Sequence, residues 1–204
     1  MNRTALIAST IALLVVMLAT AFTLRFRKVV DHARATGLNE EQKEIIAEAK
    51  AEPTPYTMHS PTDRGTGKIY MGREISQVMG HQGIRWLERS TRESEEAPSR
   101  AIGALNLEED EIIADIGAGS GYYTFRLAPL VPKGKVMAVD IQPEMIAFLE
   151  EREKELGFTN VEAHLGTIDD VQLPPNSIDA ALMVDAYHEF SHPREMMQSL
   201  FQAC

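Results

Sequence analysis

Residues 112–122, I-I-A-D-I-G-A-G-S-G-Y, constrain the fold more than any other stretch of the sequence. An apolar run that carries Asp115 meets glycines at three alternate positions, Gly117, Gly119 and Gly121, and an amphipathic segment follows. This order predicts a buried strand, a tight glycine turn and the start of a helix. Glycines allow positive φ and let a ligand approach the backbone, while a helix N-terminus offers unpaired N–H donors. The stretch therefore predicts a cradle for a nucleotide-type cofactor.

The glycine spacing separates two classes of cofactor. Dinucleotide-binding sequences carry G-x-G-x-x-G, but the position three after Gly119 is Tyr122, so the glycine that permits close helix packing is absent. Asp115, an acid just before the glycines, suits a ligand with an amino-acid end and no pyrophosphate. A second buried strand, residues 135–140, ends in Asp140, and an acid at that place can accept both hydroxyls of a ribose.

Together, D-I-G-A-G-S-G and V-M-A-V-D resemble the class I S-adenosylmethionine-dependent methyltransferases, from about Ala101 to the C-terminus. The resemblance implies a Rossmann-like, doubly wound α/β fold with a mostly parallel sheet, and S-adenosylmethionine as cofactor. It also implies direct displacement: an acceptor nucleophile attacks the sulfonium methyl, and the protein mainly aligns donor and acceptor. The cofactor-binding residues that it implies are Asp115, Gly117, Gly119, Gly121, Asp140, Ile141, Thr167 and Asp169.

A third strand, predicted over residues 160–165, runs into G-T-I-D-D, the region where the family holds the adenine. Here the spacing differs from the usual G-D of the family, so Asp169 and Asp170 both stay candidates beside Thr167 and Ile168. A solvated turn or helix cap is the alternative role for the two acids.

A fourth strand, predicted over residues 177–185, ends in a polar cluster of Asp185, Tyr187, His188 and Glu189. Ligands of open α/β sheets bind beyond the carboxyl ends of the strands, so we expect this cluster to face the methyl group. His188 is the predicted general base, because its pKa lies near neutrality, and Asp185 would orient it or the acceptor. A structural role at the strand-to-helix turn is the alternative, and we predict no metal site.

Residues 69–92 precede the first strand of this fold, and their apolar positions have helical spacing broken by glycines. In many class I methyltransferases this segment covers the cofactor and contributes to the substrate pocket. By that resemblance, Tyr70, Arg73, His81 and Trp86 are candidates for a lid. Alternatively, Trp86 packs on the sheet while Arg73 and His81 face solvent.

Charge is unevenly distributed along the 204 residues, whose net charge is −10. Residues 1–34 hold five Lys or Arg and one Asp, which leaves −14 for the remainder. Phosphate would be repelled by so acidic a body, so we expect no nucleic-acid partner and instead a small-molecule or membrane-associated methyl acceptor. The single cysteine, Cys204, excludes an intrachain disulfide and a cysteine-rich zinc site.

Residues 5–24 form an uncharged run of 20 residues, long enough to cross a bilayer. Arg25, Arg27 and Lys28 follow at once, which favours an uncleaved anchor with a cytoplasmic catalytic body. A cleaved secretory signal ending in A-T-A is the alternative and would place the body outside the cytoplasm. The predicted division is residues 1–27 as membrane anchor or signal, 28–67 as charged helix and Pro/Thr/Gly linker, and 68–204 as methyltransferase domain.

Further helices are predicted over residues 99–107, 143–156 and 193–203. A class I methyltransferase is expected to continue with a fifth strand and a final hairpin, so the domain is predicted to be C-terminally incomplete. The strand over residues 177–185 would then be an uncovered sheet edge. Two other functions stay open: a catalytically inactive, membrane-anchored binding module, and an NAD-type oxidoreductase.

Overall fold

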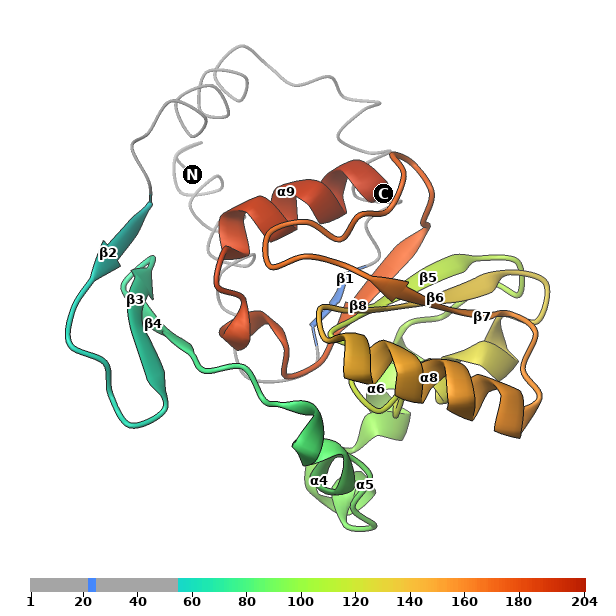
Figure 1. Cartoon of the computed structure of the whole chain (residues 1–204). Helices are drawn as coiled ribbons and strands as arrows, with labels where there is room; N and C mark the ends of the chain where they lie inside the picture. Colours follow the sequence, from blue (N-terminus) through green and yellow to red (C-terminus); the bar gives the residue numbers. More distant parts are fainter. Residues whose placement is uncertain (1–21, 25–54) are drawn as a thin grey trace, which may run out of the picture.

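The computed structural model describes residues 22–24 and 55–204, which form a five-stranded sheet flanked by helices and a separate three-stranded sheet (Figure 1). The larger sheet has the strand order β1-β8-β5-β6-β7. Four of its strands are parallel: β5 Ile112–Ile116, β6 Lys135–Asp140, β7 Val161–Leu165 and β8 Ala180–Met183. The predicted α/β fold with a mostly parallel sheet is confirmed.

Helices cover both faces of this sheet, as the continuous apolar strands require. Alternate strand residues point to opposite sides, so Ile113 packs with the α7 and α8 side chains and its neighbour Ala114 packs with those of α9. In Figure 1, α9 lies above the sheet and α8 below it. The helices after β5 are α7 Thr124–Leu127, η2 Ala128–Leu130, α8 Pro143–Leu156, η3 Tyr187–Glu189 and α9 Pro193–Ala203.

The bounds of α8 and α9 agree with the sequence prediction because local chemistry fixes them. Pro143 and Pro193 occupy the first turns, where the missing N–H costs nothing. Gly157 ends α8 in a left-handed conformation with φ of 72°. Local signals of this kind can be recognised without knowledge of the tertiary structure.

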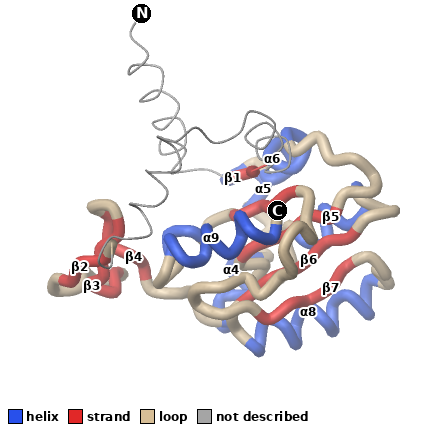
Figure 2. The backbone as a smooth tube through the Cα atoms, turned by 90° about the horizontal axis from the view of Figure 1, so that it is seen from above, coloured by secondary structure: helices blue, strands red, loops and turns tan. Residues whose placement is uncertain are grey.

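The Pro/Thr/Gly linker predicted at the end of residues 28–67 contains strands, because residues 56–58 and 65–67 pair into a sheet (Figure 2). They belong to an antiparallel sheet of β2 Tyr56–Met58, β3 Gly65–Tyr70 and β4 Arg73–Ser76. Its glycines serve packing: the Glu74 carboxylate occupies the space that a Cβ of Gly65 would need and accepts a hydrogen bond of 2.8 Å from the Gly67 N–H. Residues 28–54 lie outside the described part of the chain.

The helical spacing assigned to residues 69–92 is wrong over its first half, where the chain finishes β3 and forms β4. The hairpin turns at Gly72, whose φ of 79° favours glycine. Helix begins only later, in η1 His81–Gly83 and α4 Ile84–Leu87, followed by α5 Arg92–Glu96 and α6 Pro98–Ala104. The last of these confirms the helix predicted over residues 99–107, except that it ends at Ala104.

Contacts with the start of α9 fix the small sheet beside the large one. The Tyr56 hydroxyl donates a hydrogen bond to Glu195 and accepts one of 3.3 Å from the Arg194 N–H. Lys68 Nζ donates to the Ser191 carbonyl at 2.6 Å and lies 4.0 Å from the centroid of the Tyr56 ring. These contacts hold the small sheet, from which the segment after β4 leaves, against the start of α9.

The predicted uncovered edge at β8 is not observed, because β1 Phe22–Leu24 pairs with it in antiparallel orientation. The unpaired N–H and C=O groups of an exposed edge favour such an addition. β1 comprises the last three residues of the uncharged run predicted to cross a membrane, and residues 5–21 lie outside the described part. No helix within residues 22–24 and 55–204 is long and apolar enough to span a bilayer.

Candidate active site

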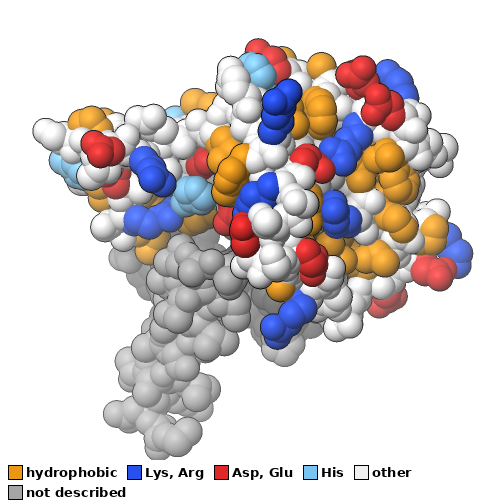
Figure 3. All heavy atoms as spheres, turned by 90° about the horizontal axis from the view of Figure 1, so that it is seen from below, with side chains coloured by type: hydrophobic (Ala, Val, Ile, Leu, Met, Phe, Trp, Pro, Cys, Tyr) orange, Lys and Arg blue, Asp and Glu red, His pale blue; other side chains and the backbone are white. Residues whose placement is uncertain are grey.

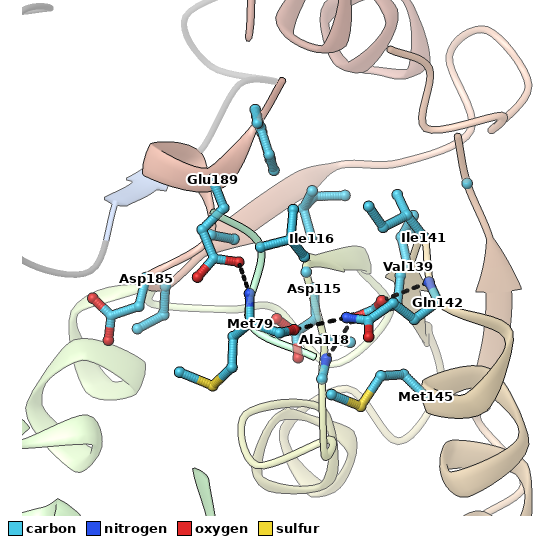
Figure 4. Close-up of a pocket in the computed structure, with 18 of the residues that line it drawn as sticks. Met79, Asp115, Ile116, Ala118, Val139, Ile141, Gln142, Met145, Asp185 and Glu189 are labelled. Atoms are coloured by element: carbon cyan, nitrogen blue, oxygen red, sulfur yellow. Dashed lines mark hydrogen bonds between the residues drawn. The ribbon is translucent and has the colours of Figure 1, made fainter. Parts of the chain in front are cut away.

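A pocket of about 380 Å³ opens at the carboxyl ends of β5, β6 and β8 (Figure 4). This is where open α/β sheets bind their ligands, and the volume is in the range of small-molecule sites. Two of the predicted site residues, Gly121 and Asp169, are not part of its lining. The predicted residues that do line it are Asp115, Gly117, Gly119, Asp140, Ile141, Thr167, Asp185 and His188.

The glycine turn after β5 forms one wall of the pocket. Gly117 and Gly119 have φ of 72° and 55°, and the N–H groups of Gly117 and Ala118 donate to the Val139 carbonyl at 2.8 and 3.0 Å. A Cβ on Gly117 would stand 2.5 Å from Cβ of Ala186, the residue before η3. The turn therefore needs glycine for its backbone and for close approach to the loop after β8.

Gly121 has a packing role. A Cβ there would collide with the Phe125 ring and lie 2.7 Å from Leu149 Cδ2, and the φ of 77° also favours glycine. The residue lets the start of α7 pack against α8 and so supports the turn from behind. The sequence pattern does not distinguish this role from ligand contact.

Asp140, at the end of β6, is bound to the glycine turn. One carboxylate oxygen accepts a hydrogen bond of 2.9 Å from the Gly119 N–H, and the other accepts one of 2.9 Å from the Gln142 N–H. Burial raises the pKa of Asp140, opposed by these backbone donors and that of Ile141. Each oxygen keeps a second lone pair, so the carboxylate can still accept ligand hydroxyls.

Asp115 is the more deeply buried acid of the pocket, with 3% of its surface exposed. Burial raises its pKa to about 6, although a hydrogen bond of 2.6 Å from Thr124 Oγ1 acts in the opposite direction. A cationic ligand group placed beside it would stabilise the charged form and lower that pKa again.

The two acids of the loop after β7 differ in position relative to the pocket. Thr167, Ile168 and Asp170 line the pocket. Asp169 instead accepts a hydrogen bond of 2.8 Å from Thr167 Oγ1, and Asp170 accepts one of 2.7 Å from Ser199 Oγ of α9. Asp170 is therefore the acid at the pocket wall.

Residues 77–80, which we call the strap, run along the mouth of the pocket. The Met79 N–H donates to Glu189 at 3.0 Å, and the Met79 carbonyl accepts from Gln142 Nε2 at 2.9 Å, as the dashed lines in Figure 4 show. The strap thus joins the loop after β6 to η3, across the pocket. Among the lid candidates, Trp86 lines the pocket and is 49% exposed, while Tyr70, Arg73 and His81 are not part of the lining.

The loop after β8 brings Asp185, His188 and Glu189 to the same mouth. Asp185 has a φ of 53°, an uncommon conformation for a residue with a side chain. Burial lowers the pKa of His188, while nearby Asp185 acts in the opposite direction. His188 Nε2 lies 3.7 Å from a Glu189 oxygen, and no hydrogen bond joins His188 to Asp185 in the described structure. The predicted role of Asp185 in orienting His188 is therefore not supported by a direct contact between the two side chains.

Two residues were missed by the sequence analysis: Arg92, which belongs to the pocket lining, and Glu88, which supports the pocket from outside the lining. Arg92, in the charged run R-E-S-E-E, lines the pocket and is 3% exposed. Glu88 accepts hydrogen bonds of 2.6 Å from Ser120 Oγ and 3.0 Å from Arg152 Nη2, which ties α4 to the glycine turn and α8. Such runs usually mark solvated helix surfaces, and only tertiary packing shows that these side chains turn inward.

Comparison with known proteins finds methyltransferases. Residues 107–204 match a family model described as "Methyltransferase domain". An uncharacterized methyltransferase-like protein of Schizosaccharomyces pombe is 32% identical over 92 residues, or 45% of this chain and 34% of that protein. The tRNA (guanine-N(7)-)-methyltransferase of Neurospora crassa is 26% identical over 141 residues, or 65% of this chain and 46% of that protein. The chain thus spans about a third to a half of the length of these two relatives.

A solved structure extends the similarity to the fold. The SAM-dependent methyltransferase from Aquifex aeolicus has 30% sequence identity and a TM-score of 0.59 over 62% of this chain and 68% of that one. The shared region therefore includes more than the glycine turn alone.

Proposed function

Because this chain belongs to the class I S-adenosylmethionine-dependent methyltransferases, we propose that it methylates a small-molecule or membrane-associated acceptor that enters between the strap and the loop after β8. One observation carries the proposal: the glycine turn, Asp115 and Asp140 face a single pocket whose mouth is rimmed by apolar side chains.

The pocket residues fit the cofactor. Gly117 and Gly119 line the pocket in left-handed conformations, with φ of 72° and 55°, so the turn presents backbone and no side chain to a ligand. We assign the ribose hydroxyls to Asp140 and the amino-acid end to Asp115, one acid for hydroxyl donors and one for an ammonium group. The adenine is assigned to the wall made by Ile141, Thr167 and Ile168.

When bound, S-adenosylmethionine supplies an electrophilic methyl group, so the remaining task of the protein is to orient the acceptor and, where needed, remove a proton. His188 can accept that proton at neutral pH, because burial lowers its pKa and keeps the imidazole neutral. Glu189, 3.7 Å from His188 Nε2, would stabilise the imidazolium that results.

The apolar rim supports an acceptor with an apolar part. It consists of residues that line the pocket and are at least 37% exposed, namely Val78, Met79, Trp86 and Ile168. On the face shown in Figure 3, basic side chains are interspersed with acidic and apolar ones, which gives little to attract nucleic acid. The Neurospora relative is a tRNA enzyme, so RNA is the acceptor class against which the proposal must be tested.

Attachment to a membrane is part of the proposal on sequence grounds alone. The uncharged residues 5–21 lie outside the described part of the chain, and the basic cluster Arg25, Arg27 and Lys28 favours a cytoplasmic body. The two other predicted functions, an inactive binding module and an NAD-type oxidoreductase, have no support among the relatives named above.

The test is a transfer assay with S-adenosylmethionine labelled in its methyl group. The full chain would be incubated with separated small-molecule, lipid, protein and RNA fractions, with Asp140→Asn as the control for cofactor-dependent transfer. We expect label in the small-molecule or lipid fraction, and less of it with the variant. Label confined to RNA or protein would overturn the acceptor class, and a failure to bind S-adenosylhomocysteine would overturn the use of this pocket.

A further inference from the structure

Arg92 begins α5 and is a buried cation in the wall of the pocket, with 3% of its surface exposed. Burying an unpaired charge is costly, so a guanidinium in this position needs partners. Leu87, whose carbonyl binds Arg92, also lies against the glycine turn, with Cδ1 3.0 Å from the place of a Cβ on Gly119. Arg92 therefore belongs to the end of the pocket formed by the glycine turn.

The partners of Arg92 leave part of the guanidinium unused. Nε donates to a Glu96 oxygen at 2.7 Å, and Nη1 donates to the Leu87 carbonyl at 3.0 Å. Glu96 also accepts a hydrogen bond from Arg89, so its negative charge is shared between two guanidinium groups. Within residues 55–204 no acceptor is found for Nη2, which leaves a cationic donor at the pocket.

The surroundings of Arg92 favour a planar anion as the missing partner. The Tyr122 ring centroid lies 4.3 Å from the guanidinium carbon and that of Tyr123 lies 5.2 Å away, so aromatic faces confine the group. A guanidinium held in this way is pre-organised for a carboxylate, which matches its fork of N–H donors.

The same end of the pocket carries one buried acid that Arg92 does not pair with. Asp115 takes its hydrogen bond from Thr124, and Arg92 acts on it only through its charge. Asp115 and Arg92 both line this pocket, and together they form the complement of a zwitterion: the acid suits an ammonium group, and the guanidinium nitrogen that lacks an acceptor suits a carboxylate.

We propose that Arg92 binds the α-carboxylate of the methionine part of the cofactor, opposite Asp115. The inference rests on the proposed use of this pocket for S-adenosylmethionine, and it adds a cofactor-binding residue that lies outside the strands and the glycine turn. It also couples the segment before β5 to the cofactor, because α5 carries the binding group.

The test compares two ligands that differ at the methionine end. S-adenosylhomocysteine has the amino-acid end, whereas methylthioadenosine has the same nucleoside and sulfur without it. For Arg92→Met in the full chain, we expect the affinity for S-adenosylhomocysteine, measured by calorimetry, to fall by about 10- to 100-fold, as for loss of a charge-assisted hydrogen bond. The affinity for methylthioadenosine should change by less than about threefold on the same scale.

Glu96→Gln is the matched control, because it removes the ion pair of Arg92 within α5 and keeps the guanidinium. We expect it to leave both affinities nearly unchanged. Equal losses of affinity for both ligands in Arg92→Met, or equal losses of affinity in the two variants, would show a structural role and overturn the inference.

Should Arg92→Met fail to fold, the wild-type chain gives the answer: equal affinity for S-adenosylhomocysteine and for its analogue without the carboxylate would overturn the inference. Wild-type protein that binds neither nucleoside would instead refute the cofactor site itself.

Discussion

The two sides of the pocket are held in different ways. On the cofactor side, the glycine turn is fixed by backbone hydrogen bonds to β6, and Asp140 binds the Gly119 and Gln142 N–H groups within the same buried unit. On the acceptor side, the strap contacts the pocket loops at Met79 through the side chains of Gln142 and Glu189, and its first residue, Gln77, donates to the Arg64 and Gly65 carbonyls.

Because of this difference, we expect one side of the pocket to determine the affinity for the cofactor and the other to control how ligands enter and leave. The core behind the glycine turn is close-packed, so the turn can move only if β5, α7 and α8 move with it. The strap carries Val78 and Met79 at 45% and 37% exposure, and segments with few buried apolar contacts open at the lowest free energy. We therefore expect substitutions on the cofactor side to affect stability and affinity strongly, and those at the strap to affect mainly the rates of ligand exchange.

The largest effect is expected from Gly121→Ala. The new methyl group would collide with Phe125 and Leu149, in addition to the strain of positive φ, so the free energy of unfolding should fall by roughly 3 kcal/mol. Gly72→Ala, in the β3–β4 turn, is the matched control, because its φ is 79° and no atom lies within 4 Å of the new Cβ. It should cost about 1 kcal/mol. Denaturant unfolding measures both, and equal losses would contradict the tight packing of the cofactor side.

Asp140→Asn is expected to reduce affinity for S-adenosylhomocysteine by roughly 100-fold, through loss of charged hydrogen bonds. The amide can accept from only one of the two backbone N–H groups that bind Asp140, so the glycine turn would also lose support. Asp169→Asn, on the loop after β7 but outside the pocket lining, should leave the affinity unchanged. Calorimetry of both variants decides the point, and similar affinities for the two would refute the role of Asp140.

Asp115 gives the binding a predictable pH dependence. Burial raises its pKa to about 6, and a ligand ammonium group favours the charged form, so the complex binds fewer protons than the free protein. Affinity for S-adenosylhomocysteine should therefore rise with pH up to about 6 and then level off, with a slope of at most about tenfold per pH unit. Titrations from pH 5 to pH 8 measure this, and Asp115→Asn should give a flat profile. A slope that persists in the variant would assign the titration to another group.

The cofactor side was predictable from the sequence because its signals are local. Glycine spacing, an apolar run and a terminal acid stand within a few residues of one another around Asp115 and Asp140, and each follows from a strand, a turn or a helix start. What the sequence left undecided were roles set by packing: Gly121 faces α8 rather than the pocket, and Asp170 rather than Asp169 reaches it.

The acceptor side was predicted poorly because tertiary contacts determine it. Residues 69–76 have apolar positions that suit a helix as well as a strand. They form a hairpin because Gly72 turns the chain and Glu74 packs over Gly65. Arg92 lies in a run of charges that would be solvated on an isolated helix. No periodicity reveals that such a side chain is covered by Tyr122 and Tyr123.

The smallest effect, and the one that most sharpens the comparison, is expected at the strap. Gln142→Ala and Glu189→Ala each remove one hydrogen bond to the Met79 backbone, worth about 1 kcal/mol. If the strap controls access, both variants should release S-adenosylhomocysteine about fivefold faster in stopped-flow measurements, while the free energy of unfolding falls by no more than about 1 kcal/mol. Glu189→Gln keeps an acceptor for the Met79 N–H and should restore the slow release of ligand. If Glu189 acted only through its charge, Glu189→Gln would release the ligand as fast as Glu189→Ala. Unchanged release rates in both alanine variants would mean that the strap is as firmly held as the glycine turn, and the two sides of the pocket would no longer differ in mobility.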